Sequence, residues 1–188
     1  MATKTKRLIE VLLVNCEMTG VPERGLLKSR NLGSVDMIWP RASIAKKSAA
    51  REFVFRKGKV DFTSEPWAKR VLFREEVEGH TAFTAAITEP VTVQKVRKFM
   101  KLTAKYALKQ GADFVEKAML GFGDLASSPV DALAAMVGEN DAPKIIAQGV
   151  VDLEELPAEG EEILVTVPLF RPKLLKGQTG SLTLAVRG

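Results

Sequence analysis

The sequence has very few of the residues that build covalent or metal-held frameworks. Its 188 residues include one cysteine, Cys16, and one histidine, His80. A single cysteine excludes an internal disulfide bond and a zinc site built from thiolates. Because Cys16 lies in the middle of an apolar segment, we expect it to be a small buried hydrophobic side chain. The fold must therefore depend on an ordinary hydrophobic core.

Long hydrophobic runs are also missing. A membrane-spanning helix needs about 18 or more consecutive apolar residues, and no stretch of the sequence approaches that length. Residues 1–7 lead into a strand-like alternation and lack the apolar centre and the cleavage site of a signal peptide. We therefore expect a soluble protein of the cytoplasm.

The short motifs of nucleotide-binding and hydrolase sites are absent as well. The sequence has no Gly-x-Gly-x-x-Gly after a strand, no Walker phosphate loop and no Gly-x-Ser-x-Gly turn. We expect His80 to be a solvated turn histidine, since no nucleophile and orienting acid converge on it in the sequence. Glu75 and Glu76 are adjacent strand residues that would point to opposite faces. The sequence thus predicts no catalytic residue, no metal ligand and no cofactor, and an enzyme of unrecognised type is the lesser alternative.

What is present is the composition of a globular protein, with an uneven distribution of charge. The chain is 46% hydrophobic and 27% charged, and its length fits a single domain over residues 1–188. Residues 1–60 contain 13 Lys and Arg against 5 Asp and Glu, whereas residues 139–162 contain eight acidic residues and one lysine. The acidic segment could neutralise the basic ones, or the basic surface could stay open to phosphate-bearing partners. The sequence leaves both possibilities open.

Short apolar alternations predict β-strands over residues 1–90. Residues 8–18 are apolar on both faces and predict a central strand, residues 19–33 predict a loop, and residues 35–39 predict a short strand. Residues 52–62 predict a hairpin around Lys57-Gly58, with Phe55 opposite Val60 and Phe53 opposite Phe62. A second hairpin is predicted between residues 67–77 and 81–88, joined by a three-residue turn at 78–80.

Two basic segments are candidate binding surfaces. Residues 41–51 are small, polar and basic, which favours a mobile loop. Residues 92–119 have the periodicity of one long amphipathic helix, and residues 94–110 carry six cations and no acid. The candidate binding residues are Arg41, Lys46, Lys47 and Arg51 in the loop, and Lys98, Lys101, Lys105 and Lys109 on the cationic face of the helix.

The remaining segments complete a mainly β fold with an α insertion. Ser128-Pro129 begins a second, shorter helix, so residues 91–140 form a helical insertion. Strands resume at residues 144–153, 162–169 and 181–187 in the closing part, residues 141–188. Eight or nine short strands with Gly and Pro turns predict an antiparallel β-sandwich.

The closing strands resemble those of a known family. Residues 147–156 (AQGVVDLEEL), the Val167-Pro168-Leu169 strand end and residues 177–186 look like the last strands of a C-two domain. Glu65-Pro66-Trp67 and the strand after it are similar to a second motif of that family, and residues 8–17 to its opening strand. The resemblance implies the phospholipid-binding sandwich of the synaptotagmin and protein kinase C type.

One departure from that family bears directly on function. Members that bind calcium carry an Asp-x-Asp pair just after the strand matched by residues 83–88, where this sequence has Glu89-Pro90-Val91. Calcium needs six to eight oxygen ligands, and this junction does not supply them. The sequence therefore predicts a degenerate C-two-like domain that acts independently of calcium.

These features predict a non-catalytic binding or scaffolding module. We expect it to dock on an acidic protein or an anionic membrane surface through the cationic helix face. Nucleic acid is disfavoured, because few aromatic side chains near the cations are placed to stack on bases. The alternative in a different class is a homo-oligomeric assembly subunit, in which the acidic residues 139–162 meet the basic helix of a second copy.

Overall fold

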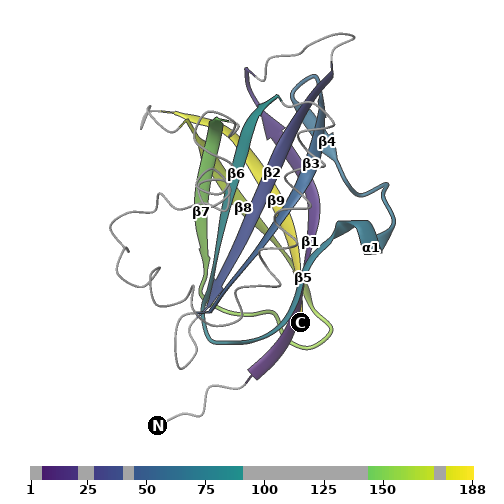
Figure 1. Cartoon of the computed structure of the whole chain (residues 1–188). Coiled ribbons are helices and arrows are strands. Elements are labelled where there is room, and N and C mark those ends of the chain that lie inside the picture. Colours follow the sequence, from purple (N-terminus) through teal and green to yellow (C-terminus); the bar gives the residue numbers. More distant parts are fainter. Residues whose placement is uncertain (1–5, 21–27, 40–44, 91–143, 172–176) are drawn as a thin grey trace, which may run out of the picture.

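The described part of the chain consists almost entirely of β-strands (Figure 1). The computed structural model describes residues 6–20, 28–39, 45–90, 144–171 and 177–188. Strands make up 76% of these residues, and the helix among them, α1 (Trp67–Arg70), is four residues long. The strands are β1 (Lys6–Met18), β2 (Lys28–Trp39), β3 (Ala45–Arg56), β4 (Lys59–Asp61), β5 (Val71–Glu78), β6 (Thr81–Pro90), β7 (Ile145–Leu153), β8 (Glu162–Phe170) and β9 (Gln178–Arg187).

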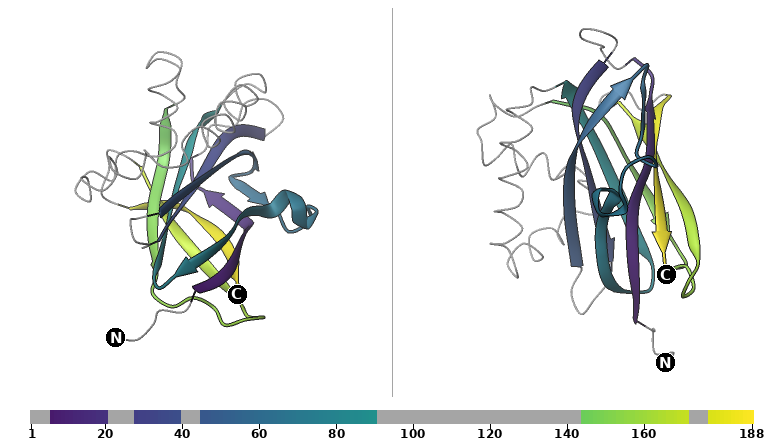
Figure 2. Two further views of the ribbon diagram at one scale, coloured as in Figure 1. Left: turned by 60° about the horizontal axis from the view of Figure 1, so that its bottom comes forward. Right: turned by 90° about the vertical axis from the view of Figure 1, so that its right-hand side faces the viewer.

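Eight of these strands close into an antiparallel barrel. Hydrogen bonds join them in the order β4-β3-β2-β6-β7-β8-β9-β1, and β4 also pairs with β1, which completes the ring. Figure 2 shows the strands surrounding one interior. The β-sandwich predicted from the sequence is therefore wrong. A sandwich has two sheets with separate edges, whereas here β4 connects the two ends of a single sheet.

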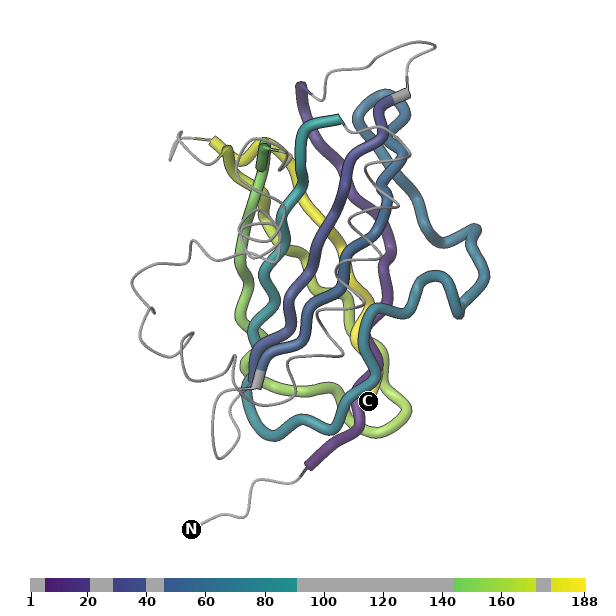
Figure 3. The backbone as a smooth tube through the Cα atoms, in the orientation of Figure 1, coloured from purple at the N-terminus to yellow at the C-terminus, as the bar shows by residue number. Residues whose placement is uncertain are grey.

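One position in the barrel wall is filled by a strand in two pieces. β4 pairs with the C-terminal part of β1, where Val60 lies opposite Cys16, and β5 pairs with the N-terminal part, where Phe73 lies opposite Val11. The chain between the two pieces, residues 62–70, includes α1 and swings out from the barrel wall (Figure 3). β4 and β5 thus follow one another along the same edge of β1.

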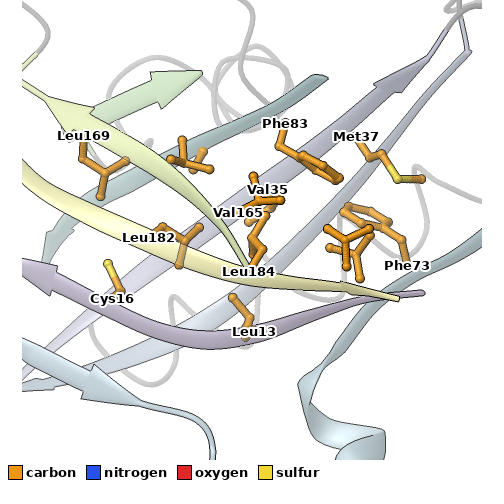
Figure 4. Close-up of a cluster of buried hydrophobic side chains, with 14 of the residues drawn as sticks. Leu13, Cys16, Val35, Met37, Phe73, Phe83, Val165, Leu169, Leu182 and Leu184 are labelled. Carbon is orange, nitrogen blue, oxygen red and sulfur yellow. The ribbon is translucent and has the colours of Figure 1, made fainter. Parts of the chain in front are cut away.

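The barrel interior holds a core of buried apolar side chains. Side chains from β1, β2, β6, β8 and β9 point toward one another between the facing strands, as Figure 4 shows for Leu13, Met37, Phe83, Val165 and Leu184. Phe53, Phe55 and Phe62 are fully buried, and the rings of Phe53 and Phe62 meet edge to face with centroids 5.0 Å apart. Apolar burial of this kind is the main stabilising term of the fold.

A β-bulge in β1 changes which face points inward. Ile9, Val11 and Leu13 are inward-facing core residues, but after a shift in register with β9 between Leu13 and Asn15 the core residues are Cys16 and Met18. The extra residue of a bulge turns the following side chains to the opposite face. The expectation that Cys16 is buried is confirmed, and burial raises the pKa of its thiol.

The first predicted turn is confirmed. Lys57 and Gly58 form a two-residue turn with φ angles of 51° and 74°, and Arg56 pairs with Lys59 on either side of it. Both residues have positive φ, as a type I′ hairpin turn requires. Beyond that pair the two strands part, because β4 turns to pair with β1. The predicted pairs of Phe55 with Val60 and of Phe53 with Phe62 therefore do not form, and Val60 lies opposite Cys16 instead.

Three predictions about residues 19–90 are wrong. Residues 28–33 belong to β2 and not to a loop. The supposed mobile loop over residues 41–51 is strand from Ala45 onward, and β3 pairs with β2 from Ala45 to Arg56. The second hairpin does not form, since β5 pairs with β1 while β6 pairs with β2 and β7. Both edges of β6 are taken, so β5 has no edge of β6 to join.

The closing strands agree with prediction, and the insertion cannot be compared. β7, β8 and β9 match the strands expected at residues 144–153, 162–169 and 181–187. The long helix expected over residues 92–119 and the shorter helix expected after Ser128 lie outside the described residues. The description "mainly β with α insertion" is replaced by a nearly all-β closed barrel for the part of the chain that is described. Within that part, no helix has the length and apolar character needed to cross a membrane.

Candidate functional site

The predicted basic residues that the structure describes all lie on β3, and each has an acidic partner. Lys46 pairs with Asp36, Lys47 with Glu75, and Arg51 with Glu65. Arg41 and the four lysines of the expected helix face, Lys98, Lys101, Lys105 and Lys109, lie outside the described residues. Each described cation of the predicted loop therefore forms an ion pair within the chain.

Lys46 takes part in a buried polar cluster on the outer face of the barrel. Its Nζ lies 2.9 Å from Asp36 Oδ2, and the Thr84 hydroxyl donates to the same oxygen at 3.2 Å. Asp36 lies directly across from Ser48 on β3 and from Thr84 on β6, so the cluster joins three adjacent strands. Asp36 Oδ1 is buried without a hydrogen-bond partner.

Burial controls the chemistry of Asp36. Its side chain is 2% exposed, and desolvation raises the pKa of the carboxyl above its ordinary value, although Lys46, Ser48 and Thr84 act in the opposite direction. An ionised carboxylate in such a place needs a partner, and the Lys46 ammonium provides one. The cluster fixes the register of β2 between β3 and β6 and is best described as structural.

Lys47 and Arg51 belong to the opposite face of β3. Successive strand residues alternate between faces, so Lys47 and Arg51 share the inward face with Phe53 and Phe55, which are core residues. The Arg51 guanidinium stacks 5.0 Å from the centre of the Phe62 ring and also donates to the carbonyl oxygen of Lys69. Two cations are therefore placed on the face that elsewhere forms the apolar core.

These inward cations lie along a part of β3 whose second edge has no backbone ladder among the described residues. In the described part of the chain, the edge of β3 that faces away from β2 is paired only through Arg56 and Lys59. β5 is paired only with β1. We call the facing edges of β3 (residues 45–55) and β5 (Val71–Glu78) the seam. The two strands are antiparallel neighbours, since β5 runs in the same direction as β4.

Side chains, not a backbone ladder, bridge the seam. Glu75 shares the inward face of β5 with the core residues Phe73 and Val77, and it meets Lys47 across the seam. Glu65, from the segment before α1, meets Arg51. The Lys47 side chain is 51% exposed and the Glu75 side chain 23% exposed, so solvent reaches this contact. Chemically, the seam offers strand edges and two exchangeable ion pairs.

The three residues that the sequence offered to an enzymatic site, His80, Glu75 and Glu76, lie apart in the structure. His80 is an exposed turn residue, as expected, with its Nε2 3.7 Å from Asp152 Oδ1. Glu75 is engaged with Lys47, and Glu76 is exposed on the other face of β5. Among the described residues, no group of three or more His, Cys, Asp or Glu side chains is arranged to hold a metal ion.

Sequence reasoning missed the acidic half of the site. The sequence does not reveal these partners, because Lys47 and Glu75 are 28 residues apart in the chain and Arg51 and Glu65 are 14 apart. One local signal was available. Lys47, Ala49, Arg51 and Phe53 occupy alternate positions, which indicates a strand whose inner face changes from charged to apolar.

Comparison with known proteins gives little beyond this geometry. No family model and no curated protein matches the chain. A solved structure described as "CC2D1B coordinates ESRCT-III activity during the mitotic reformation of the nuclear envelope" is similar with a TM-score of 0.37 and 14% identity. The match covers 99% of this chain and 55% of that chain. A TM-score this low carries no argument about fold or function.

Fold and site together define a class in structural terms only. The chain is a closed antiparallel β-barrel in which one strand position is split and one wall is held by side-chain ion pairs. The C-two resemblance stays a prediction, and the sandwich that it implied is replaced by this barrel.

Proposed function

We propose that the chain is a non-catalytic binding module that captures an extended segment of an acidic partner protein at the seam. The segment adds as a strand to the exposed edge of β3. The observation that carries this proposal is the edge itself: from Ala45 to Phe55, β3 is paired with β2 on one side, and on the other side it faces β5 with no backbone ladder among the described residues.

Strand edges bind other strands because their backbone N–H and C=O groups point outward in a regular array. Proteins that recognise extended peptides use such an edge for affinity and use side-chain positions for specificity. Proteins that must avoid this pairing protect the edge, often with inward-pointing charges. Lys47 and Arg51 are inward-pointing charges, so the edge repels cationic strands and is compatible with acidic ones.

The acidic character of the partner follows from the same two residues. Lys47 and Arg51 are the only described cations on the inward face of β3, and both already bind carboxylates of this chain. A carboxylate from a partner would find the same donors in the same places. This supports an acidic protein, which is one of the two partners predicted from the sequence, the other being an anionic membrane surface.

The test uses a fluorescein-labelled probe peptide, Thr-Thr-Glu-Thr-Val-Thr-Glu-Thr-Thr, which is rich in strand-forming residues. We expect saturable binding by fluorescence anisotropy, together with new protection from hydrogen exchange in the amides of β3. Amides of β8, which is paired with β9 along its whole length, serve as the internal reference.

Backbone pairing is then separated from simple charge attraction. Two further versions of the probe carry N-methyl groups on alternate amides, so that each version loses the donors along one edge of the bound strand. We expect at least one of them not to bind. Equal binding of both methylated versions and the parent would rule out strand addition.

A further inference from the structure

The side chains along the seam also indicate which acidic segments would bind there; this inference rests on the proposed function. Along the inward face of the β3 edge, the sequence of side chains is Lys47, Ala49, Arg51. Ala49 is half-buried and packs against the core, while the residues on either side of it are cationic. A strand lying beside β3 places alternate residues opposite these three positions.

The chain's own carboxylates already occupy the two cationic positions. Glu75 comes from β5 and Glu65 from the segment that leads into α1, so the two acids reach β3 from different elements. Their side chains are 23% and 33% exposed. The Lys47 side chain is 51% exposed, so exchanging its carboxylate partner for another is nearly neutral. Arg51 is 19% exposed and keeps a second acceptor, the Lys69 carbonyl oxygen, when its carboxylate is exchanged.

We propose that the partner segment carries the pattern acid-x-apolar-x-acid, and that Glu65 and Glu75 are internal competitors that it displaces. The two acids of the segment bind Lys47 and Arg51, and the apolar residue between them lies against Ala49. Glu65 and Glu75 satisfy the two cations when no partner is bound. The gain on binding comes from the new backbone ladder, since the ion pairs are exchanged one for one.

Removing the acids of these ion pairs and removing their cations should therefore have opposite effects on the affinity for the probe peptide. In the Glu65→Gln/Glu75→Gln double variant, the competitors are gone while both cations remain. We expect the probe peptide to bind roughly threefold to tenfold more tightly, the range for removing two partly exposed pairs. In the Lys47→Gln/Arg51→Gln double variant, we expect binding at least about tenfold weaker, because charge-assisted hydrogen bonds are lost.

A matched control and a matched peptide complete the experiment. Glu162→Gln removes the carboxylate of another exposed ion pair, with Arg187 on the far side of the ring, and should leave affinity unchanged. The second peptide carries Gln in place of both Glu residues. Thermal unfolding of each variant verifies that the fold is kept.

Two results would overturn the inference, and they differ from failure of the proposed function. If the Glu and Gln peptides bind equally, strand capture stands and selection for acids is wrong. If the Glu65→Gln/Glu75→Gln variant binds no more tightly than the parent chain, the two glutamates are not competitors. If neither peptide binds any variant, the proposed function and the inference both fall.

Discussion

Asp36 is a carboxylate on the outer face of the barrel that is nevertheless almost completely buried. Alternation along β2 places Val35 and Met37 in the core and Asp36 on the other side, where an exposed polar residue would be ordinary. Its contacts with Lys46 and Thr84 explain why a charged residue is tolerated there. Its raised pKa has a consequence for the dependence of stability on pH.

Replacing Asp36 with Asn should reveal this dependence. Because the pKa of Asp36 in the folded chain lies above its ordinary value of 3.8, the folded chain binds a proton between those two pH values that the unfolded chain does not. The free energy of unfolding contributed by Asp36 therefore increases as the pH falls through the raised pKa toward 3.8. Urea unfolding of wild type and Asp36→Asn at a series of pH values should show the wild type gaining relative stability over this window.

Asp61 supplies a control of opposite sign. Hydrogen bonds from the Thr63 hydroxyl and backbone N–H lower the pKa of Asp61, so its contribution to stability is lost as the pH falls through that pKa. The Asp61→Asn variant should therefore lose its deficit relative to wild type on acidification. If the Asp36 difference changes in the same direction as the Asp61 difference, Lys46 controls the Asp36 carboxyl more strongly than burial does.

At the scale of single strands, the close approach of a neighbouring backbone explains why β7 contains a glycine. Gly149 in β7 lies against the Pro168 carbonyl oxygen of β8, and a Cβ at Gly149 would overlap that oxygen. β7 and β8 are paired at Gln148 and Phe170. The absence of a side chain at Gly149 thus lets β8 come close beside β7.

Gly149→Ala should be destabilising by about 1–3 kcal/mol, the usual cost of overpacking. Chemical denaturation measures it, with Gln148→Ala as the neighbouring control, since Gln148 is only half-buried. A cost for Gly149→Ala no larger than that of the control would mean that β7 and β8 can separate at little cost.

Local patterns predicted most of the strands but not their partners. The apolar residues of β7, β8 and β9 alternate clearly, which predicts these strands. The Lys57-Gly58 turn is predicted because apolar residues alternate on both sides of it and Gly58 readily takes a positive φ. Local pattern predicts a loop around Gly33, where the structure has β2. The Phe53 ring packs where a Gly33 side chain would lie, so glycine is needed at this position of the strand. That reason exists only in three dimensions.

The pairing of β5 shows why the candidate site was only half predicted. The connection between β5 and β6 is residues 79–80, with Gly79 at φ 67°, and not the predicted three residues 78–80, since Glu78 belongs to β5. Loop length alone cannot reveal that both edges of β6 are occupied. Lys47 and Arg51 were identified from their charge. Glu65 and Glu75 depend on β5 lying along β1, which is a long-range pairing that no local signal specifies.

For the whole molecule, closure depends on short contacts near Cys16. Cys16 lies opposite Val60 of β4 on one side and Leu182 of β9 on the other, and it is fully buried. β4 is only three residues long, so it is the narrowest part of the ring. The single thiol of the chain therefore lies beside the shortest strand of the ring.

Val60→Pro should increase the rate at which a thiol reagent labels Cys16 under native conditions. Proline removes a backbone donor and disfavours strand pairing, which weakens the contact between β4 and its neighbours. A buried thiol with a raised pKa reacts slowly until the structure opens. Leu164→Ala on the exposed surface of β8 is the control, since that side chain is 65% exposed. Rapid labelling of Cys16 in the unaltered chain would contradict the closed ring.

The pairing of β1 with β9 also sets an order in time. β1 ends at Met18 and β9 begins at Gln178, so the ladder between them joins strands separated by nearly the whole length of the chain. During synthesis, β1 emerges before β9 and must wait for the residues between them before this neighbour exists. Its apolar inner face has no complete shelter until then. Long-range pairing of this kind slows folding, so the newly made chain passes through a period in which its first strand is available to chaperones or to other chains.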